Sequence, residues 1–258
     1  MANNLEHSRR NKPHTPGVFI TFEGGDGVGK TTHLRNLAEV LKSQGLEVLC
    51  LREPGGTQIS EQLRSIVLNS SNTEMCAESE LFTFEAARAQ LVSEVIMPAL
   101  RRGAVVLCDR FIDSTVVYQG FGRGLDVGFI KQANNIACQG LLPHRTLLLV
   151  AGGAEVGLKR ASELSCPDRM ERAGINFHSR VVQGFLQLAS EDESRIRVVQ
   201  SGGETSKTAL AILSELTDIF PWLETFMREH EREFCHLDAT RTHEGRIHLN
   251  AYGSETHN

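Results

Sequence analysis

Short apolar, β-branched runs alternate with longer amphipathic segments along most of the chain. The apolar runs predict five strands, near residues 18–22, 48–51, 104–108, 146–150 and 196–199. Apolar residues at helical spacing predict helices near 31–43, 58–68, 79–101, 128–138, 154–163, 175–189 and 206–219. This alternation is typical of an α/β fold with three layers, in which helices flank both faces of a parallel β-sheet.

Polar segments lie at both ends of this pattern. Residues 1–16 are polar and contain two prolines, so they predict a disordered lead-in. The pattern breaks down after Trp222, and residues 223–258 hold five of the ten histidines. We expect a polar C-terminal tail there, at most a frayed helix followed by a flexible segment. A metal-binding tail is the alternative, but the histidine spacings match no common ligand pattern. The folded domain is therefore predicted to span 17–222.

The overall composition narrows the class of protein. The chain has 258 residues, of which 40% are hydrophobic and 23% charged, and its net charge is -5. This balance gives no strong attraction to nucleic acid. No apolar run approaches the ~18 residues of a membrane span. No apolar segment follows Arg9 and Arg10, so we expect no secretory signal and a cytoplasmic location.

The six cysteines are scattered along the chain and form no C-x-x-C pair. They are interpreted as reduced, mostly buried thiols, with a zinc site as the weaker alternative.

The segment GGDGVGKT, residues 24–31, lies between the first predicted strand and the first predicted helix. It satisfies the pattern G-x-x-x-x-G-K-[ST], in which glycines let backbone N–H groups surround phosphate oxygens. Lys30 would add a full charge at the β- and γ-phosphates, and the alternative of a chance glycine-rich turn leaves this lysine without a role. The predicted ATP-binding residues are Gly24, Gly25, Asp26, Gly27, Val28, Gly29, Lys30, Thr31 and Thr32.

A second part of this site is predicted at the end of another buried strand. AVVLCDR, residues 104–110, is an apolar run that ends in Asp109. A carboxylate there would lie beside the phosphate loop and, with the Thr31 hydroxyl, hold Mg²⁺. The alternative is an aspartate that caps the next segment.

Other signatures separate the classes of phosphate-loop protein. A GTPase needs a guanine-reading Asn-Lys-x-Asp after a later strand, but the only Asn-Lys pair, at residues 11–12, precedes the loop. A small kinase instead needs an acceptor pocket and a cationic lid, and the sequence offers candidates for both.

A series of further motifs follows in order: LREPGGTQISEQLRSIVL, LFTFEAARAQLVSEVIMPAL, DRFIDSTVVYQGFGRG, EVGLKRA and DRMER. From about residue 18 to 220 the series closely resembles bacterial thymidylate kinases. The resemblance implies a P-loop nucleoside monophosphate kinase that uses ATP and Mg²⁺ to phosphorylate dTMP to dTDP, as a homodimer. The open alternatives are a kinase for another pyrimidine monophosphate and a non-catalytic P-loop nucleotide-binding protein.

The resemblance also implies an acceptor site. Phe84 and Arg88 would share a helix face, with the ring stacked on thymine and the guanidinium at a base carbonyl. Without the resemblance, core packing for Phe84 and a surface charge for Arg88 are the simpler interpretations. Asp26 matches the residue that accepts the 3′-hydroxyl of the sugar. The implied dTMP-binding residues are Asp26, Arg52, Glu53, Phe84, Arg88, Arg110, Ser114, Thr115, Tyr118 and Gln119.

A basic lid is implied at about residues 160–173. Gly27 stands where some members of the family carry a loop arginine, so the resemblance leaves the lid to supply the guanidinium for phosphoryl transfer. A solvated basic loop is the alternative. Ala151 stands where the family usually has an aspartate, which leaves the hinge of the lid in doubt. The residues implied in catalysis are Lys30, Asp109, Arg110, Arg160, Arg169 and Arg172.

Overall fold

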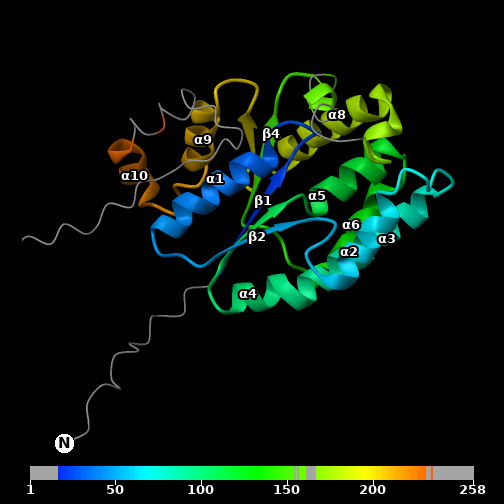
Figure 1. Ribbon diagram of the computed structural model, residues 1–258, viewed down its shortest axis with the longest axis horizontal. Coiled ribbons are helices and arrows are strands. Elements are labelled where there is room, and N and C mark those ends of the chain that lie inside the picture. Colours follow the sequence, from blue (N-terminus) through cyan, green and yellow to red (C-terminus); the bar gives the residue numbers. More distant parts are fainter. Residues whose placement is uncertain (1–16, 154, 156, 161–166, 231–233, 235–258) are drawn as a thin grey trace, which may run out of the picture.

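A five-stranded sheet, with all strands parallel, runs through the molecule (Figure 1). The computed structural model describes residues 17–153, 155, 157–160, 167–230 and 234. The strand order is β2-β3-β1-β4-β5, so the first strand lies in the middle. The strands confirm the predicted α/β fold and are β1 (Val18–Glu23), β2 (Val48–Arg52), β3 (Val105–Asp109), β4 (Arg145–Val150) and β5 (Ile196–Gln200).

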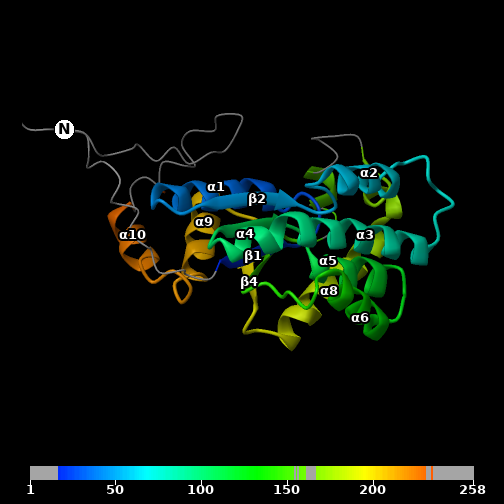
Figure 2. The same ribbon diagram turned by 90° about the horizontal axis from the view of Figure 1, so that it is seen from below.

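Helices cover both faces of this sheet (Figure 2). On one face, α1 and α9 pack against the strands, and on the other face α4 and α8 do so, with α2, α3, α5 and α6 beyond them. The helices are α1 (Lys30–Ser43), α2 (Gln58–Val67), α3 (Ala77–Leu91), α4 (Met97–Arg101), α5 (Ile112–Thr115), α6 (Val127–Ala137), α8 (Ile175–Glu191), α9 (Thr205–Ser214) and α10 (Leu223–Glu229).

The central strands bury side chains on both faces, as parallel strands between helix layers must. Ile20 and Phe22 of β1 join the cluster under α1, whereas Phe19 joins the cluster on the opposite face. The order of the strands reverses at β1, which has β3 on one side and β4 on the other. In open α/β sheets ligands bind at such a reversal, beyond the carboxyl ends of the strands.

The helix predicted over 79–101 is interrupted in the structure. A π-helical turn at Val92–Ile96 separates α3 from α4. Pro98 follows this turn, and its ring would collide with the carbonyl group one α-turn earlier while offering no N–H. The wider π turn relieves that conflict. A second π-helical segment, Val116–Gly122, has no counterpart among the predicted helices because its β-branched and glycine residues are poor helix formers.

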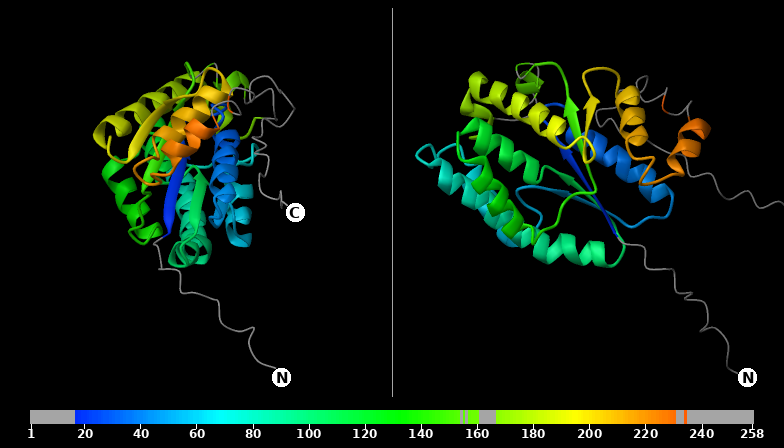
Figure 3. Two further views of the ribbon diagram at one scale, coloured as in Figure 1. Left: turned by 90° about the vertical axis from the view of Figure 1, so that its left-hand side faces the viewer. Right: turned by 180° about the vertical axis from the view of Figure 1, so that it is seen from behind.

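The C-terminal segment contributes to the core, although a polar tail was expected from residue 223. Leu223, Phe226 and Phe234 are buried in the cluster that also contains Leu37 and Val40 of α1. The His230 ring stacks on Phe226 at 4.1 Å. Figure 3 shows α10 beside α9. The helix α10 and Phe234 therefore belong to the folded core, beyond the boundary predicted at residue 222.

Several predictions fall partly or wholly on residues outside the described ranges. In the helix predicted at 154–163, the described residues 155 and 157–160 are helical. The predicted lead-in, residues 1–16, and most of the expected tail lie outside the described ranges. Among the described cysteines all are free; Cys108 and Cys138 are buried, but Cys50 and Cys76 are exposed. Within the described residues no helix is long and apolar enough to span a bilayer.

Candidate active site

The loop between β1 and α1 is shaped by glycines. Gly24, Gly27 and Gly29 have φ angles of 133°, 69° and 94°, which other residues rarely adopt. At Gly24 a Cβ would also lie 2.3 Å from the carbonyl oxygen of Leu149. The loop ends at Lys30, the first residue of α1. The free N–H groups and the dipole of that helix end favour an anion.

Lys30 is buried and its ammonium group is held by the loop itself. Its Nζ donates to the carbonyl oxygens of Gly24 at 3.1 Å and Gly25 at 2.7 Å. Burial, and then the charge of Arg110, lower the pKa of Lys30 below its usual value. An incoming phosphate would relieve both effects because it supplies negative charge beside a buried cation.

Thr31 and Asp109 meet as the sequence predicts. The Thr31 hydroxyl donates to Asp109 Oδ2 at 2.6 Å, although the residues are 78 positions apart. A hydroxyl and a carboxylate are hard oxygen ligands of the kind that Mg²⁺ uses beside phosphates. Within the described residues no group of three His, Cys, Asp or Glu side chains could hold a metal. The Thr31 hydroxyl and the Asp109 carboxylate thus fit an ion of this kind.

Arg110 connects β3 to the phosphate loop. Its backbone has a φ of 71°, an uncommon value for a residue with a side chain. The guanidinium donates to the Gly24 carbonyl, the Ser114 hydroxyl and the Asp26 carboxylate. It also lies 5.0 Å from the centre of the Tyr118 ring. The turn in the backbone thus directs one cation toward the loop.

The Asp26 carboxylate contacts Arg110 and Tyr118. Its Oδ1 accepts from Arg110 and its Oδ2 accepts from the Tyr118 hydroxyl at 3.3 Å. Burial alone would raise the pKa of Asp26, but the charges of Arg110 and Lys30 outweigh burial and hold it below the usual value. Asp26 is therefore an ionised acceptor at neutral pH.

Two pockets adjoin at this point. The phosphate pocket is lined by the second half of the loop, by Lys30, Thr31 and Thr32, and by Asp109, whereas Gly24, Gly25 and Val28 line a separate cavity behind the loop. A second, acceptor-side pocket contains Phe84 and Tyr118. The linings of the phosphate pocket and the acceptor-side pocket share Asp26, Glu53, Arg64, Arg110 and Glu171. The remaining residues that line the acceptor-side pocket are Pro54, Leu68, Phe84, Arg88, Ser114, Thr115, Tyr118, Gln119, Asp168 and Met170.

The thymidylate kinase family model matches residues 22–210, most of the chain. The chain belongs to the thymidylate kinase family. It is 44% identical over 211 residues to a thymidylate kinase of Geobacter sulfurreducens, covering 80% of this chain and 99% of that protein. A thymidylate kinase of Synechococcus sp. is 46% identical over 212 residues, covering 82% and 100%.

A solved structure of the family has the same architecture. The crystal structure of thymidylate kinase from Ehrlichia chaffeensis matches with a TM-score of 0.63 and 32% identity. The match covers 78% of this chain and all of that one. The resemblance that the sequence motifs implied is thus confirmed.

The structure places all the implied dTMP-binding residues except Arg52 in the lining of the acceptor-side pocket. Arg52 lines the phosphate pocket, where its guanidinium donates to the Pro54 carbonyl and to Glu61. The other implied residues line the acceptor-side pocket and come from the phosphate loop, the segment after β2, α3 and the segment after β3: Asp26, Glu53, Phe84, Arg88, Arg110, Ser114, Thr115, Tyr118 and Gln119.

Arg88 is the centre of a buried network in the wall of this pocket. Its guanidinium contacts Glu53 and Glu85 and donates to Thr115 Oγ1, Asn134 Oδ1 and the Phe111 carbonyl. A base carbonyl would therefore have to share a donor with one of these groups. Burial outweighs the charge of Arg88 and raises the pKa of Glu53 to about 7.

The lid arginines do not line the phosphate pocket. Arg169 instead turns toward α2 and α3, where its Nε donates to the Val67 carbonyl and its Nη1 lies 2.6 Å from Glu80. This geometry does not support the expected contact of Arg169 with the transferred phosphoryl group. Arg160 and Arg172 are exposed, so their catalytic role stays a prediction. Residues 161–166 of the expected lid lie outside the described ranges.

Sequence reasoning missed three charged groups. Arg64 of α2 lines both pockets, but in the sequence it looks like an ordinary cation in the last turn of a helix. Glu80 is fully buried and binds Gln119, Arg123 and Arg169. An acidic residue in the first turn of a predicted helix gives no sign of this burial.

Glu23 is the third missed group. It ends β1, is fully buried, and accepts from the backbone N–H groups of Phe111 and Ser114 and from the Ser114 hydroxyl. Burial, reinforced by the charge of Asp113, raises its pKa to about 7. It fixes the turn that follows Arg110. The only signal was an acidic residue at the end of an apolar strand.

Proposed function

We propose that the chain transfers the γ-phosphoryl group of ATP to dTMP, producing dTDP and ADP for dTTP synthesis. The observation that carries this proposal is the pair of adjoining pockets, which share Asp26 and Arg110. One pocket carries the phosphate loop and the other an aromatic ring, Phe84. A donor phosphate and an acceptor phosphate could therefore meet beside one half-buried cation, Arg110.

The attacking group in this reaction is a phosphate oxygen. A phosphate monoester loses its second proton near pH 6, so it is already largely ionised at neutral pH. No strong general base is needed, and the rate must come from alignment and charge neutralisation. Lys30 would bind the transferred phosphate, and Arg110 would hold the acceptor phosphate against it.

Thr31 and Asp109 would hold Mg²⁺ with the nucleotide. The ion would neutralise charge on the β- and γ-phosphate oxygens. The hydroxyl already donates to the carboxylate at 2.6 Å. The two ligand atoms thus lie side by side at the start of α1.

The acceptor base and sugar would be selected by the second pocket. Phe84 of α3 is half-buried and offers a ring for stacking. Tyr118 and Gln119 lie in the π-helical segment Val116–Gly122 and are almost fully buried. They would leave little room around the sugar. The ionised Asp26 is a natural acceptor for a sugar hydroxyl.

We also propose a homodimer through an apolar face on α2, α3 and α6. These helices pack side by side, and their exposed large apolar residues are Ile59, Ile66, Phe82, Phe129 and Ile136. Phe82 and Phe129 form an edge-to-face pair across α3 and α6. An apolar surface spread over three neighbouring helices favours a second copy as its cover. Sedimentation of the protein and of Ile66→Glu tests this, because a dimer should dissociate on the substitution.

The free cysteines support a reducing, cytoplasmic location. Cys50 and Cys76 are exposed and unbridged. Exposed thiols persist where glutathione and thioredoxin keep them reduced.

A coupled assay of ADP release tests the reaction. It is run with ATP and Mg²⁺ against dTMP, dUMP, CMP and AMP in turn. The proposal expects release that depends on dTMP and is far weaker with the other acceptors. Preference for another pyrimidine nucleotide would identify a different monophosphate kinase. ATP binding without acceptor-dependent release would identify a non-catalytic nucleotide-binding protein.

A further inference from the structure

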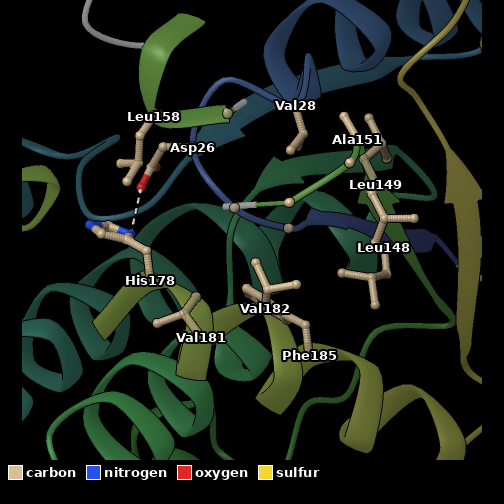
Figure 4. A pocket seen from close by; sticks show the side chains of 16 residues that line it. Asp26, Val28, Leu148, Leu149, Ala151, Leu158, His178, Val181, Val182 and Phe185 are labelled. Atoms are coloured by element: carbon tan, nitrogen blue, oxygen red, sulfur yellow. Dashed lines mark ion pairs between the residues drawn. The ribbon is translucent and has the colours of Figure 1, made fainter. Parts of the chain in front are cut away.

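His178 lies outside both nucleotide pockets but contacts two residues that line them. The side chain comes from α8 and is 3% exposed. Its Nδ1 lies 3.9 Å from Asp26 Oδ2, and its Nε2 lies 3.3 Å from the carbonyl oxygen of Glu171. Figure 4 shows the ring facing Asp26 at the edge of a cavity behind the phosphate loop.

The two contacts of His178 fall at one place in the site. Asp26 and Glu171 both line the phosphate pocket and the acceptor-side pocket. They come from segments about 145 positions apart, the loop after β1 and the 3₁₀ turn before α8. His178 connects them from behind, through its two ring nitrogens.

The remaining surroundings of the His178 ring are mainly apolar. The cavity beside it is lined mainly by apolar side chains, among them Val28, Val181 and Phe185. The neighbouring Phe177 ring packs edge-on at 5.3 Å. A buried polar ring is costly unless its polar atoms find partners. The His178 Nε2–H donates to the Glu171 carbonyl oxygen at 3.3 Å. Nδ1 lies 3.9 Å from Asp26 Oδ2, which is beyond hydrogen-bond distance and is an ion pair only when the ring is protonated.

Asp26 is held from the opposite side by close packing. A Cβ at Gly157 would lie 2.2 Å from the carbonyl oxygen of Asp26, so the backbone of the two segments is in direct contact. The main chain of Asp26 is thereby fixed. Its carboxylate has two direct partners, Arg110 and Tyr118, and both line the acceptor-side pocket. His178 is the nearby polar group that approaches from outside that pocket.

We propose that His178 is a positioning residue for the acceptor nucleotide. It holds the Asp26 carboxylate and the Glu171 backbone at the boundary between the two pockets, without touching either nucleotide. This inference rests on the proposed function, because it takes the pocket with Phe84 as the acceptor site. It assigns His178 an effect on acceptor binding rather than on ATP binding.

The test compares four substitutions in the full-length enzyme. His178→Phe keeps an aromatic ring of similar size and removes both nitrogens. His178→Gln keeps a polar group near the place of Nε2. Val182→Ala is the matched control, since Val182 lies on the same helix and lines the same cavity without a polar contact. Asp26→Asn reports on the acceptor site itself. The measurements are KM for dTMP, KM for ATP, kcat and the melting temperature.

We expect His178→Phe to raise KM for dTMP by about tenfold, the scale of one lost polar interaction. KM for ATP and the melting temperature should stay close to those of the parent and of Val182→Ala. His178→Gln should lie between the parent and His178→Phe in KM for dTMP.

Three outcomes would overturn the inference. The first is an unchanged KM for dTMP in His178→Phe while Asp26→Asn raises it. The second is an equal rise in both KM values with a fall in melting temperature, which describes a packing residue. The third is His178→Gln behaving no better than His178→Phe. If Asp26→Asn also leaves KM for dTMP unchanged, the acceptor-site assignment fails instead, and the inference falls with it.

Discussion

The phosphate side and the acceptor side of the site are built in opposite ways. On the phosphate side one continuous segment, 24–31, supplies most of the polar groups, and Lys30 binds carbonyl groups five and six positions before it. On the acceptor side Arg88 reaches Glu53, 35 positions before it, and Asn134, 46 positions after it. The first is specified by local backbone geometry, whereas the second exists only when the whole fold is complete.

Because of this difference, substitutions on the phosphate side should mainly affect catalysis, whereas substitutions on the acceptor side should also affect stability. A change in the phosphate loop removes a charge from the reaction but few contacts from the core. A change in the acceptor wall leaves buried charges without partners, which destabilises the fold as well as the pocket. The two sides should therefore respond differently to substitution.

The largest effect is expected for Lys30→Ala. Turnover should fall about a thousandfold or more, the scale of losing one cation from a phosphoryl-transfer site. Circular dichroism should show that the fold survives, because the Lys30 ammonium donates to loop carbonyls and not to core groups within the described part of the chain. Lys42→Ala, on the exposed face of the same helix, is the control and should keep parental turnover. Near-parental turnover in folded Lys30→Ala would contradict the phosphate-loop assignment.

Arg88→Met should have the opposite character. It strands Glu53 and Glu85 in the interior, so the free energy of unfolding should fall by about 3–5 kcal/mol. Urea denaturation measures this loss. Arg102→Met removes an exposed ion pair with Glu47 and should cost less than about 1 kcal/mol. Equal, small losses in both variants would show that the buried network is not what holds the acceptor wall.

Glu23 gives a pH test beside the phosphate loop. Its pKa is raised from 4.5 to about 7 by burial and by Asp113, so the folded state binds its proton more tightly than the unfolded state. Stability should therefore fall as the pH rises from about 4.5 to 7, by up to roughly 3 kcal/mol at 1.4 kcal/mol per unit. Above pH 7 this loss is complete.

Denaturation of Glu23→Gln across the same pH range measures the contribution. The variant should have a shallower decline, because an amide does not titrate. Glu53 has a similarly raised pKa on the acceptor side, so part of the decline should remain. A variant whose profile runs parallel to that of the parent would exclude Glu23 as a titrating group.

Phe84→Ala should act on one nucleotide only. Loss of base stacking costs about 1–3 kcal/mol in nucleic-acid complexes, and we expect dTMP affinity to weaken on that scale. ATP affinity should be unaffected. Calorimetric titration of each nucleotide measures both, with Glu78→Ala, at an exposed residue of the same helix, as the control. Equal weakening of both nucleotides would indicate a general defect in α3.

The smallest effects on stability are expected for Arg169→Ala and Arg172→Ala. In Arg169→Ala, Glu80 loses one partner but keeps Arg123 and Gln119. The free energy of unfolding should therefore fall by about 1–2 kcal/mol. Arg172 is exposed, so its loss should leave the free energy of unfolding close to that of the parent, and kcat of this variant tests the catalytic role that the resemblance implied. Values of kcat should stay within a few-fold of the parent in Arg169→Ala. A drop of about a hundredfold or more there would restore the phosphoryl-transfer role that the sequence suggested.

The contrast between the two sides also explains what the sequence could predict. The strands and the phosphate loop follow from local signals: apolar runs, glycine spacing, and a lysine followed by a hydroxyl. Asp109 was found because it ends a buried strand that must lie beside the loop in a parallel sheet. The pairing of Asp109 with Thr31 is thus a consequence of topology.

Long-range burial could not be predicted in the same way. Glu80 and Arg64 have the residue types and positions of ordinary surface charges on helices. Glu80 is buried only when Gln119, Arg123 and Arg169 pack against it in the complete fold, and Arg64 joins the pockets only when α2 packs on α3. The motifs of the family identified Arg88 but not its partners. The burial of Leu223, Phe226 and Phe234 could not be predicted from the sequence, because the segment after Trp222 is mostly polar. Three apolar residues are too few to form a recognisable helical pattern.

The burial of Phe234 has a consequence for synthesis on the ribosome. Phe234 lines the same small cavity as His33, Leu37 and Val40 of α1. At a typical elongation rate of about 5–20 residues per second, about 10–40 seconds separate the emergence of α1 from that of its last cover. During that interval the apolar face of the helix behind the phosphate loop is only partly sheltered, so a nascent chain at this stage is a natural client for chaperones.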